Sequence, residues 1–409
     1  MRILVFNAGS SSLSYKVFDV HGSRKPDVVF KGKAYRVGVK GTEPSYMENT
    51  CNGKTEKRTV DIPDHRTAAA LAAQYIVTHG IGVDAVGHRF VHGGEYFKRS
   101  EILDAASLAE ITQCLPLAPL HNPISFAVIH EAMLAFADIP HYVVIDSAFH
   151  ATMPSKAYHY PLPQDIIARF KFRRFGFHGI SYSYICDRMP GLLNVPLERL
   201  NMIVCHLGTG GASVMAVENG VSVDTSMGFS PNSGLIMSTR SGDIDPAVLL
   251  ELVRREGLAP SEVEALLNNK SGLRGVSGFS SDITDIINNV DHPLRGARAR
   301  LALDMYIFRL KSYIGSYVMA LKGRMDALVF TDDIGVGNPL IRELACGSLA
   351  WAGIVIDKEK NRQARHDTSA FVQAAASKVA IVSIPTEEEL MICLEGGRIL
   401  EGKLCPTSS

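Results

Sequence analysis

Two segments, one at residues 1–20 and one at residues 202–217, share a pattern of strand, loop and strand. In each, β-branched and aromatic residues flank a loop of small residues, Asn7–Ser12 in the first and His206–Ser213 in the second. This pattern predicts a β-hairpin, and Asn219-Gly220 predicts a further tight turn after the second. Because each segment opens one half of the chain, the repetition predicts a duplicated α/β fold of two domains with a central cleft.

The length of the chain agrees with this duplication. Its 409 residues exceed the size at which a single hydrophobic core is usual, so we expect two domains. We place the N-terminal domain at residues 1–148 plus 385–409, and the C-terminal domain at residues 149–384.

Helical patterns fill much of the chain between the strands. They cover residues 64–80, 124–137 and 295–322, and Pro246 opens another helix at a first-turn position. The longest helix carries an apolar stripe at alternating steps of four and three, which packs either in a core or at a subunit contact. The stripe consists of Leu303, Ile307, Leu310, Ile314, Tyr317 and Leu321. Strands that alternate with helices indicate an α/β protein.

Composition argues against several kinds of partner. Lys plus Arg and Asp plus Glu both number 42, so the zero formal net charge favours neither nucleic acid nor an anionic membrane. We find no apolar stretch of membrane-spanning length and no secretory signal pattern. The seven cysteines lack the spacing of a zinc site or a disulfide framework. We therefore expect a soluble, cytoplasmic protein.

The two loops have the chemistry of phosphate sites. Each offers backbone N–H groups and small side chains, so a phosphate can approach closely and meet several donors without a repelling charge. Ser10 and Ser12 belong to the first loop, and Gly208 and Gly210 to the second. A Ser-rich hairpin turn is the plain alternative for either loop alone, but two such loops favour phosphate.

Standard motifs for related chemistry are missing from the sequence. Gly53-Lys54-Thr55 resembles the end of a P-loop, but Glu48 stands where the first glycine belongs. Gly208 and Gly210 are not followed by a third glycine at the dinucleotide spacing, and neither H-E-x-x-H nor G-x-S-x-G occurs. P-loop NTPases, Rossmann dehydrogenases and α/β-hydrolases thereby lose most of their support.

Several polar residues lie in otherwise apolar or glycine-rich surroundings. They are Arg89, His121, Asp146, His178 and Arg240. Asp146 follows the buried-type strand 143–145, and charged residues at strand ends tend to line the ligand crevice of α/β folds. A structural hydrogen-bonding role is the alternative for each residue taken singly.

At these residues the sequence resembles the acetate kinase family. The resemblance extends over nearly the whole chain in collinear blocks, which makes it specific. The blocks are N-A-G-S-S-S, G-H-R-x-V-H-G-G, L-A-P-L-H-N-P, D-S-A-F-H, G-F-H-G, H-L-G, D-T-S-M-G, T-R-S-G-D-I-D-P, S-G-L-x-G-x-S-G and P-T-E-E-E-L. The resemblance implies the superfold shared by sugar kinases, actin and heat-shock chaperone ATPases. It also implies reversible phosphoryl transfer between ATP and acetate, with acetyl phosphate as product.

A carboxylate acceptor is already ionised at neutral pH, so this transfer needs positioning and charge neutralisation more than a general base. The resemblance implies that Arg89 and Arg240 hold the acyl carboxylate and the transferring phosphoryl group. It implies that His178, and less directly His121, stabilise charge in the transition state. Asp146 would orient Mg²⁺ or its waters.

Further residues receive roles from the resemblance alone. Asn7 and Glu388 would support Mg²⁺, with Mn²⁺ as an alternative, although Glu388 also fits a surface position in an acidic helix start. The phosphate or nucleotide side would use Ser10, Ser12, His206, Gly208, Gly210, Asp282 and Gly335. A small acyl pocket would be formed by Val91, Leu120, Phe177 and Pro231. One methylene discriminates by only about 1–3 kcal/mol, so propionate is an alternative substrate.

Three departures from the family pattern fall on the nucleotide side. Thr209 replaces the usual Asn of the second loop, and Asp282-Ile283-Thr284 lacks the Arg that would flank adenine. Asp332-Asp333 stands where the adenosine loop has Gly-Gly. These side chains add bulk and negative charge where a base and its phosphates would approach. Pyrophosphate and phosphate in place of ATP and ADP are therefore an alternative pair.

Other classes of function have less support. A degenerate regulatory homologue would be favoured by loss of Arg89, Arg240, His178 or Asn7, and all four are present. An actin-like or chaperone-type ATPase needs a working adenosine loop, and a sugar kinase needs a base for a hydroxyl acceptor. The resemblance also implies a homodimer, with the helix after Arg295 as a candidate contact.

Overall fold

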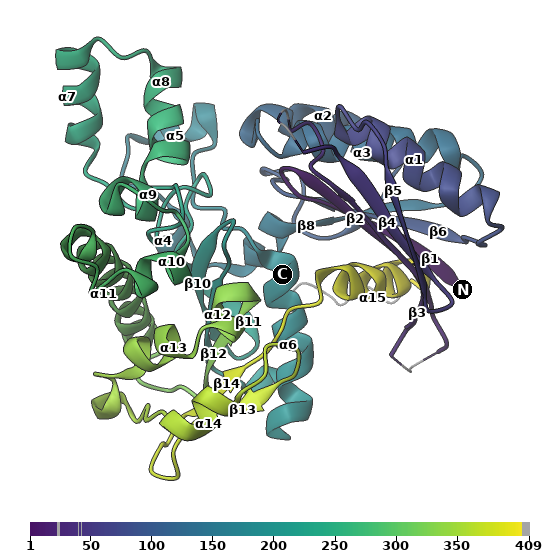
Figure 1. The fold of residues 1–409 in the computed structure, drawn as a ribbon. Coiled ribbons are helices and arrows are strands. Elements are labelled where there is room, and N and C mark those ends of the chain that lie inside the picture. The colour runs from purple at the N-terminus through teal and green to yellow at the C-terminus, as the bar shows by residue number, and fades with distance from the viewer. Residues whose placement is uncertain (23–24, 40, 42, 403–409) are drawn as a thin grey trace. The chain divides into compact units, whose positions relative to one another are not determined.

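The computed structural model describes residues 1–22, 25–39, 41 and 43–402 (Figure 1). The chain forms two compact units. Unit 1 contains Met1–Ala151, Gly179–Tyr184 and the chain from Glu387 onward, and unit 2 contains Thr152–His178 and Ile185–Thr386. The sequence-based boundaries differ from these in one substantial respect, because 179–184 belongs to unit 1. Gly179 packs so tightly on Asp146 that a Cβ atom would overlap the Asp146 carbonyl oxygen.

Unit 1 is built on an eight-stranded sheet in the order β5-β4-β3-β2-β1-β6-β8-β7. Its strands are β1 (Arg2–Ala8), β2 (Ser12–Asp19), β3 (Asp27–Tyr35), β4 (Tyr46–Cys51), β5 (Lys54–Thr59), β6 (Ala85–Phe90), β7 (Glu101–Ile102) and β8 (His141–Ile145). β1 pairs antiparallel with β2, as the hairpin prediction requires, and parallel with β6, which pairs parallel with β8.

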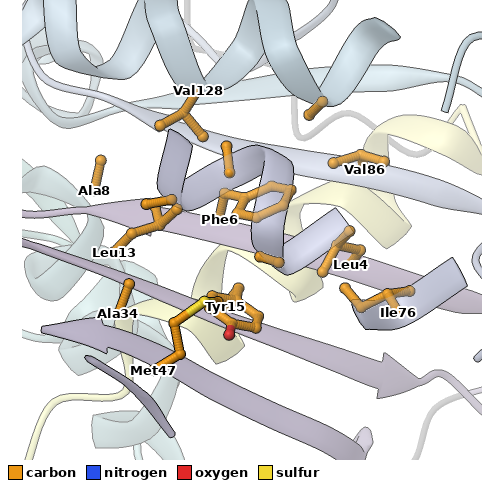
Figure 2. Packing of buried hydrophobic residues seen from close by; sticks show 14 of the residues in the cluster. Leu4, Phe6, Ala8, Leu13, Tyr15, Ala34, Met47, Ile76, Val86 and Val128 are labelled. Atoms are coloured by element: carbon orange, nitrogen blue, oxygen red, sulfur yellow. The ribbon is translucent and has the colours of Figure 1, made fainter. Parts of the chain in front are cut away.

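Helices cover both faces of this sheet (Figure 1). They are α1 (His65–Thr78), α2 (Ala105–Cys114), α3 (Asn122–Ala135) and α15 (Glu388–Leu400). Figure 2 shows Leu4, Phe6 and Val86 from the strands together with Ile76 of α1 and Val128 of α3. All five are at most 2% exposed, so burial of this apolar face is the main force that fixes the helices on the sheet.

Unit 2 is built on a six-stranded sheet in the order β11-β10-β9-β12-β14-β13. Its strands are β9 (Met202–Leu207), β10 (Ala212–Glu218), β11 (Val221–Thr225), β12 (Ala327–Thr331), β13 (Ala370–Phe371) and β14 (Ala380–Ser383). The Asn219-Gly220 turn connects β10 to β11, and both of its residues have positive φ, 52° and 80°. Positive φ at both positions characterises the tight hairpin turn that Asn-Gly predicts.

The two sheets repeat one topology, which confirms the predicted duplicated α/β fold. In unit 1, β1, β2 and β3 form an antiparallel meander, and β6 and β8 extend the sheet in parallel from β1. In unit 2, β9, β10 and β11 form the same meander, and β12 and β14 extend it in parallel from β9. The Gly/Ser loop therefore lies between the first two strands of each meander.

The remaining helices belong to unit 2, except that α6 begins in unit 1. They are α4 (Ser155–Tyr158), α5 (Gln164–Phe170), α6 (Gly179–Leu193), α7 (Pro246–Glu256), α8 (Pro260–Ala265), α9 (Gly272–Ser277), α10 (Ile283–Asn288), α11 (Gly296–Ala320), α12 (Asp332–Gly337), α13 (Pro339–Cys346) and α14 (Lys358–Gln363). The predicted stripe of α11 is buried throughout, so it is core. Within the described ranges, no helix has the length and apolarity that a membrane span requires.

Tyr142 of β8 attaches α15 to the sheet of unit 1. Its hydroxyl donates to the carbonyl oxygen of Ile392 at 2.9 Å, and the side chain is fully buried. Gly396 of α15 leaves room for the ring, because a Cβ atom there would overlap it. Gly397, one residue later in the same helix, has nothing within 4 Å of the equivalent position.

We expect Gly396→Ala to destabilise unit 1 by about 1–3 kcal/mol, because overpacking displaces either the Tyr142 ring or α15. The matched control is Gly397→Ala, which should leave stability unchanged or raise it by up to about 1 kcal/mol through helix propensity. Urea unfolding of the two variants measures the difference. Equal free energies of unfolding would contradict this description of the packing.

Two histidines form a buried pair beside β1. His88 and His141 are 1% and 4% exposed, with His88 Nε2 3.0 Å from His141 Nδ1. His141 Nε2 lies 3.1 Å from the Phe136 carbonyl oxygen, so it carries the proton and His141 Nδ1 accepts. Burial, aided by His141, places the pKa of His88 well below 6.5, and burial also lowers the pKa of His141. Both rings are therefore neutral in the folded protein.

This pair should make the folded protein less stable in acid. The folded-state pKa values lie below 6.5, so the contribution of the two neutral histidines to stability is fully present above that pH. As the pH falls, the histidines of the unfolded chain take up protons first, and this contribution is lost. The loss is at most about 1.4 kcal/mol per pH unit for each histidine. His88→Phe should reduce this slope in urea unfolding between neutral pH and pH ~5. An unchanged slope in His88→Phe would contradict the prediction.

Candidate active site

In unit 1, polar residues gather where three parallel strands end. Asn7 lies near the end of β1, Arg89 near the end of β6, and Asp146 directly after β8. The parallel register places Phe6 opposite His88 and Arg89 opposite Val144, so these three polar residues come to one edge of the sheet. The carboxyl ends of parallel strands are the usual ligand-binding edge of an α/β sheet. The first turn of α15 adds Glu388 and Glu389.

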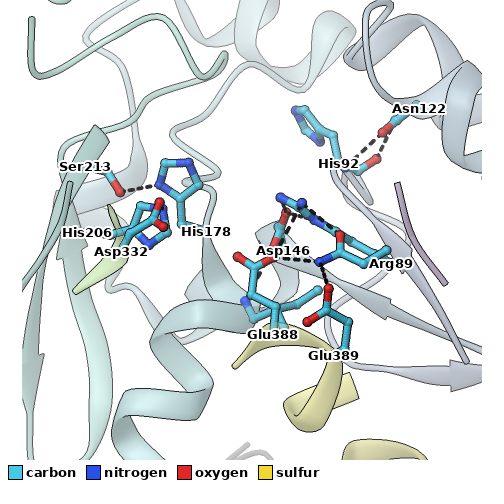
Figure 3. A network of polar contacts seen from close by, with 12 residues as sticks. Arg89, His92, Asn122, Asp146, His178, His206, Ser213, Asp332, Glu388 and Glu389 are labelled. Carbon is cyan, nitrogen blue, oxygen red and sulfur yellow. Dashed lines mark hydrogen bonds and ion pairs between the residues drawn. The ribbon is translucent and has the colours of Figure 1, made fainter. Parts of the chain in front are cut away.

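Hydrogen bonds join these residues into one network (Figure 3). Arg89 donates from Nε and Nη2 to Asp146 Oδ2, at 3.0 and 2.8 Å, and from Nη1 to Asn7 Oδ1 at 3.2 Å. Asn7 Nδ2 donates to Glu388 at 3.1 Å and to Glu389 at 3.3 Å. The other oxygen of Asp146 accepts from the Ile180 N–H at 3.3 Å. The network fixes every side chain at this edge.

Charge inside this network is partly balanced. Burial opposes ionisation of Arg89, but Asp146 and then Glu388 outweigh it and raise the pKa of the guanidinium. Burial would raise the pKa of Glu389, but Lys16, 3.3 Å away, together with hydrogen bonds to the carboxylate, lowers it. Asp146, Glu388 and Glu389 thus contribute three carboxyl groups to this network, and Arg89 and Lys16 contribute two cationic side chains.

The donor set of this cluster suits a hard divalent cation. Carboxylate and amide oxygens are the ligands of Mg²⁺ and Mn²⁺. Within the described residues, no three His, Cys, Asp or Glu side chains form a preformed metal cage. Mg²⁺ is usually held by one or two carboxylates together with substrate phosphate oxygens.

Asn122 supports the segment after β6. Fully buried, it donates to the His92 carbonyl oxygen at 2.9 Å and accepts from the His92 N–H at 3.1 Å. This fixes the backbone beside Val91, which is 5% exposed. His121 directly precedes α3 and is half-buried, whereas Leu120 is 55% exposed.

In unit 2, two histidines stack beside the second loop (Figure 3). His206 lies in β9, so the second loop is shorter than the sequence predicts. A hydrogen bond from the Gly208 N–H to the Gly211 carbonyl oxygen, at 3.0 Å, closes this loop. His178 and His206 have ring centroids 4.0 Å apart. His178 Nδ1 lies 2.8 Å from Ser213 Oγ of β10, which orients the ring.

The backbone at His178 is strained. His178 has φ of 61°, in the left-handed region that costs a non-glycine residue of order 1–3 kcal/mol. It directly precedes α6, whose first residue is Gly179. Such strain persists only where the surroundings enforce it, and it is concentrated at functional sites.

Arg240 reaches the same loop and has no carboxylate partner among the described residues. Its Nη1 lies 3.3 Å from the Pro231 carbonyl oxygen and 4.0 Å from Met237 Sδ. Burial lowers the pKa of Arg240, and no carboxylate counteracts it. A Cβ atom on Gly211 would lie 3.2 Å from Arg240 Nη1 and 3.3 Å from His178 Nε2. Both side chains therefore converge on Gly211.

The two aspartates that depart from the family pattern face this loop. Asp332 Oδ2 lies 3.0 Å from His206 Nε2, and a Cβ atom on Gly208 would overlap the Asp332 carboxylate. Asp333 accepts from the N–H of Thr209 at 2.8 Å and from its hydroxyl at 2.6 Å. Asp332 has φ of 66°, a conformation that favours glycine. Negative charge therefore lies beside one of the two expected phosphate loops.

The structure places the other expected residues as follows. Ser10 is exposed and Ser12 half-buried around the first hairpin turn, and Gly210 is exposed in the second. Asp282 precedes α10 and accepts from the Thr284 N–H at 2.8 Å, so it acts as an N-cap. Gly335 is buried in α12, and its carbonyl oxygen accepts from Arg342 at 2.8 Å.

The four expected pocket residues divide between the units. Val91 and Leu120 belong to unit 1, and Phe177 and Pro231 to unit 2. Phe177 is 1% exposed, and Pro231 is half-buried.

Sequence reasoning missed Glu389, Lys16 and Ser213. Glu389 follows Glu388, and the helix α15 begins at Glu388. A prediction of this helix start could have identified Glu389, because both carboxylates of the first turn contact Asn7. Lys16 of β2 and Ser213 of β10 are identified only through their contacts, because Lys16 Nζ lies 3.3 Å from Glu389 and Ser213 Oγ lies 2.8 Å from His178 Nδ1.

Comparison with known proteins gives consistent results. The family model described as the acetokinase family matches residues 2–394. The chain is 42% identical to an acetate kinase from Thermoanaerobacterium thermosaccharolyticum, over 98% of this chain and 99% of that protein.

Solved structures agree. A crystal structure of acetate kinase from Entamoeba histolytica matches with a TM-score of 0.89 and 38% identity, over 98% of this chain and 100% of that one. A propionate kinase from Francisella tularensis subsp. tularensis matches with a TM-score of 0.86 and 33% identity, over 96% and 98%. The polar residues at the strand ends of unit 1 and around the second loop of unit 2 thus lie in a chain that belongs to the acetokinase family.

Proposed function

We propose that this protein is an acetate kinase, which transfers a phosphoryl group reversibly between ATP and the carboxylate of acetate. The observation that carries the proposal is Arg240. A guanidinium that is desolvated, lacks a carboxylate partner among the described residues and lies beside a glycine loop is suited to bind an anionic group. Membership of the acetokinase family supplies the reaction class.

The chemistry requires little proton transfer. The acetate carboxylate is ionised at neutral pH, and one of its oxygens attacks the terminal phosphorus of the donor. The new O–P bond forms as the bond from phosphorus to the leaving oxygen breaks, and ADP departs with the electron pair. The barrier is mainly repulsion between two anions, which positive charges and fixed dipoles reduce.

Individual roles follow from the local geometry. Arg240 and the Gly210 N–H would hold phosphoryl oxygens, with Ser10 and Ser12 donating from the first loop. Gly208 would shape the second loop, because its own N–H donates to the Gly211 carbonyl oxygen. His178, held by Ser213, would stabilise charge on the transferring group through its Nε2 edge. Arg89 would hold the acyl carboxylate, with His121 in a supporting role.

Divalent metal is part of the proposal. Asn7, Asp146, Glu388 and Glu389 provide the hard oxygen atoms that suit Mg²⁺ or Mn²⁺. When bound, such a cation neutralises phosphate charge. Arg89 would orient Asp146, because it donates two hydrogen bonds to that carboxylate.

We propose that Val91 and Leu120 of unit 1, and Phe177 and Pro231 of unit 2, are apolar residues that contact the acyl group. Apolar side chains of this kind suit a methyl group. Acetate and propionate differ by one methylene, so the preference between them amounts to about 1–3 kcal/mol.

A second candidate function uses pyrophosphate in place of ATP, and Asp332 and Asp333 favour it. Their carboxylates face Gly208 and Thr209, at a position where the family pattern has glycines. A nucleotide base needs close backbone approach there, whereas pyrophosphate has no base. The acetate chemistry is the same for both donors.

We also propose a cytoplasmic homodimer. The buried stripe of α11 is not available for a subunit contact. Its other side exposes Leu301, Met305 and Phe308, at 53%, 39% and 71%, and this side is the candidate contact.

The donor is tested by trapping acetyl phosphate as acetohydroxamate in reactions with acetate, Mg²⁺ and either ATP or pyrophosphate. We expect acetate-dependent product with one donor. Product with ATP alone supports the first candidate, and product with pyrophosphate alone supports the second. The proposed function would be rejected if neither donor gave product and both reverse reactions also failed. The reverse reactions are the formation of ATP from acetyl phosphate and ADP, and the formation of pyrophosphate from acetyl phosphate and phosphate.

The role of Arg240 predicts a gain in stability when it is removed. Arg240→Met should raise the free energy of unfolding by about 0.5–2 kcal/mol, because a desolvated charge is lost from the folded state. Inorganic phosphate should raise the thermal midpoint of the unaltered protein but not that of the variant. Arg255→Met, at an exposed arginine paired with Glu251, is the control and should show no gain. A less stable Arg240→Met protein that still responds to phosphate would contradict the assignment.

A further inference from the structure

Arg240 lies in a loop of unit 2 that a single aspartate closes. The loop runs from Gly234 to Asp243. The Asp243 N–H donates to the Gly234 carbonyl oxygen at 3.1 Å, and the Gly234 N–H donates to Asp243 Oδ1 at 2.7 Å. Asp243 thus joins the two ends of the loop with both its backbone and its side chain.

The same carboxylate connects the loop to α11. Asp243 Oδ2 accepts from the Tyr313 hydroxyl at 2.5 Å and lies 3.3 Å from Arg309 Nη1. Arg309 Nη1 also donates to the carbonyl oxygens of Asp243 and Gly234, at 3.3 and 3.4 Å. Because α11 is anchored in the core by its buried stripe, this connection holds the loop against a rigid element.

Arg240 depends on the shape of this loop, because its side chain has few contacts of its own. The guanidinium has the Pro231 carbonyl oxygen at 3.3 Å as its nearest hydrogen-bond acceptor. Its backbone carbonyl accepts from the Met237 N–H, inside the loop, at 3.2 Å. The backbone on either side of Arg240 is also held from residues 267–274, because the Ser241 N–H donates to the Leu267 carbonyl oxygen at 3.1 Å and the Thr239 carbonyl oxygen accepts from the Ser271 N–H at 3.0 Å. The Asp243 contacts add the connection to α11, and the Arg240 side chain itself adds little resistance to a shift of the loop.

The contacts of Asp243 with α11 also affect the charge around Arg240. Asp243 is three residues from Arg240 and is the acidic side chain nearest to it in the sequence. Arg309 and Tyr313 engage its carboxylate, so it is not available to neutralise Arg240. The pKa of Tyr313 is raised by burial and by its hydrogen bond to Asp243, so the hydroxyl stays protonated as a donor.

We propose that Asp243, Tyr313 and Arg309 are positioning residues, which hold Arg240 in place and keep its charge unpaired for the phosphoryl substrate. This inference rests on the proposed function, in which Arg240 binds an anionic group. It assigns to α11 a role in phosphoryl transfer, although the helix contributes no residue to the second loop.

The test is a double-mutant cycle of Tyr313→Phe and Arg240→Met, in which turnover is measured by acetohydroxamate formation with the active donor. With Arg240 present, Tyr313→Phe should reduce kcat about tenfold, equivalent to about 1.4 kcal/mol in the barrier. In the Arg240→Met background it should change kcat less than about twofold, because the residue through which it acts is gone. The control is Tyr306→Phe on the same helix, since the Tyr306 hydroxyl has no hydrogen-bond partner among the described residues. It should leave kcat unchanged.

Different outcomes separate this inference from the proposed function. Equal fold-losses for Tyr313→Phe in both backgrounds would show a general structural role and overturn the positioning role alone. Full activity of Tyr313→Phe with Arg240 present would overturn it as well. Full activity of Arg240→Met would overturn the proposed role of Arg240 and, with it, the inference.

Discussion

The charge of Arg240 in unit 2 is half-buried and has no carboxylate partner among the described residues. Arg89 in unit 1 is a useful contrast. It is also half-buried, but Asp146 and Glu388 stabilise its charge. Arg240 Nη1 has the Pro231 carbonyl oxygen at 3.3 Å, and an anion that binds beside it would stabilise the positive charge. In the proposed function this anion is the transferring phosphoryl group.

Backbone geometry keeps these charged groups in place. His178 adopts a left-handed conformation and still has Nδ1 beside Ser213, so its ring direction is fixed before substrate arrives. Gly179 is required on the next position because it meets the Asp146 carbonyl oxygen. The positive φ of His178 is therefore held by the contact of its ring with Ser213 and by the close packing of the next residue, Gly179, on Asp146. Catalytic groups that are oriented in this way need little reorganisation in the transition state.

Much of the fold was predictable, because it depends on local patterns. The two hairpins, the Asn219-Gly220 turn and the buried stripe of α11 follow from strand composition, turn chemistry and helical periodicity. The site was less predictable. Asp146 and Arg89 are recognisable as polar residues at strand ends, but Glu389, Lys16 and Ser213 enter only through pairings between distant segments, such as Asn7 with α15. The carboxylate of Asp282 accepts a hydrogen bond at a helix N-cap, which its family motif alone did not indicate.

The Asp332-Asp333 pair departs from the family pattern, and its contacts lie within the second loop and the start of α12. Asp332 accepts the left-handed conformation of a glycine position, since aspartate tolerates it better than most residues, and its carboxylate accepts from the Asp333 N–H at 2.9 Å. Asp333 then bonds Thr209, which itself departs from the family pattern. The substituted residues therefore satisfy one another, and the backbone path from β12 into α12 is kept. What changes is the charge and volume beside Gly208, which are the properties that a phosphoryl donor meets.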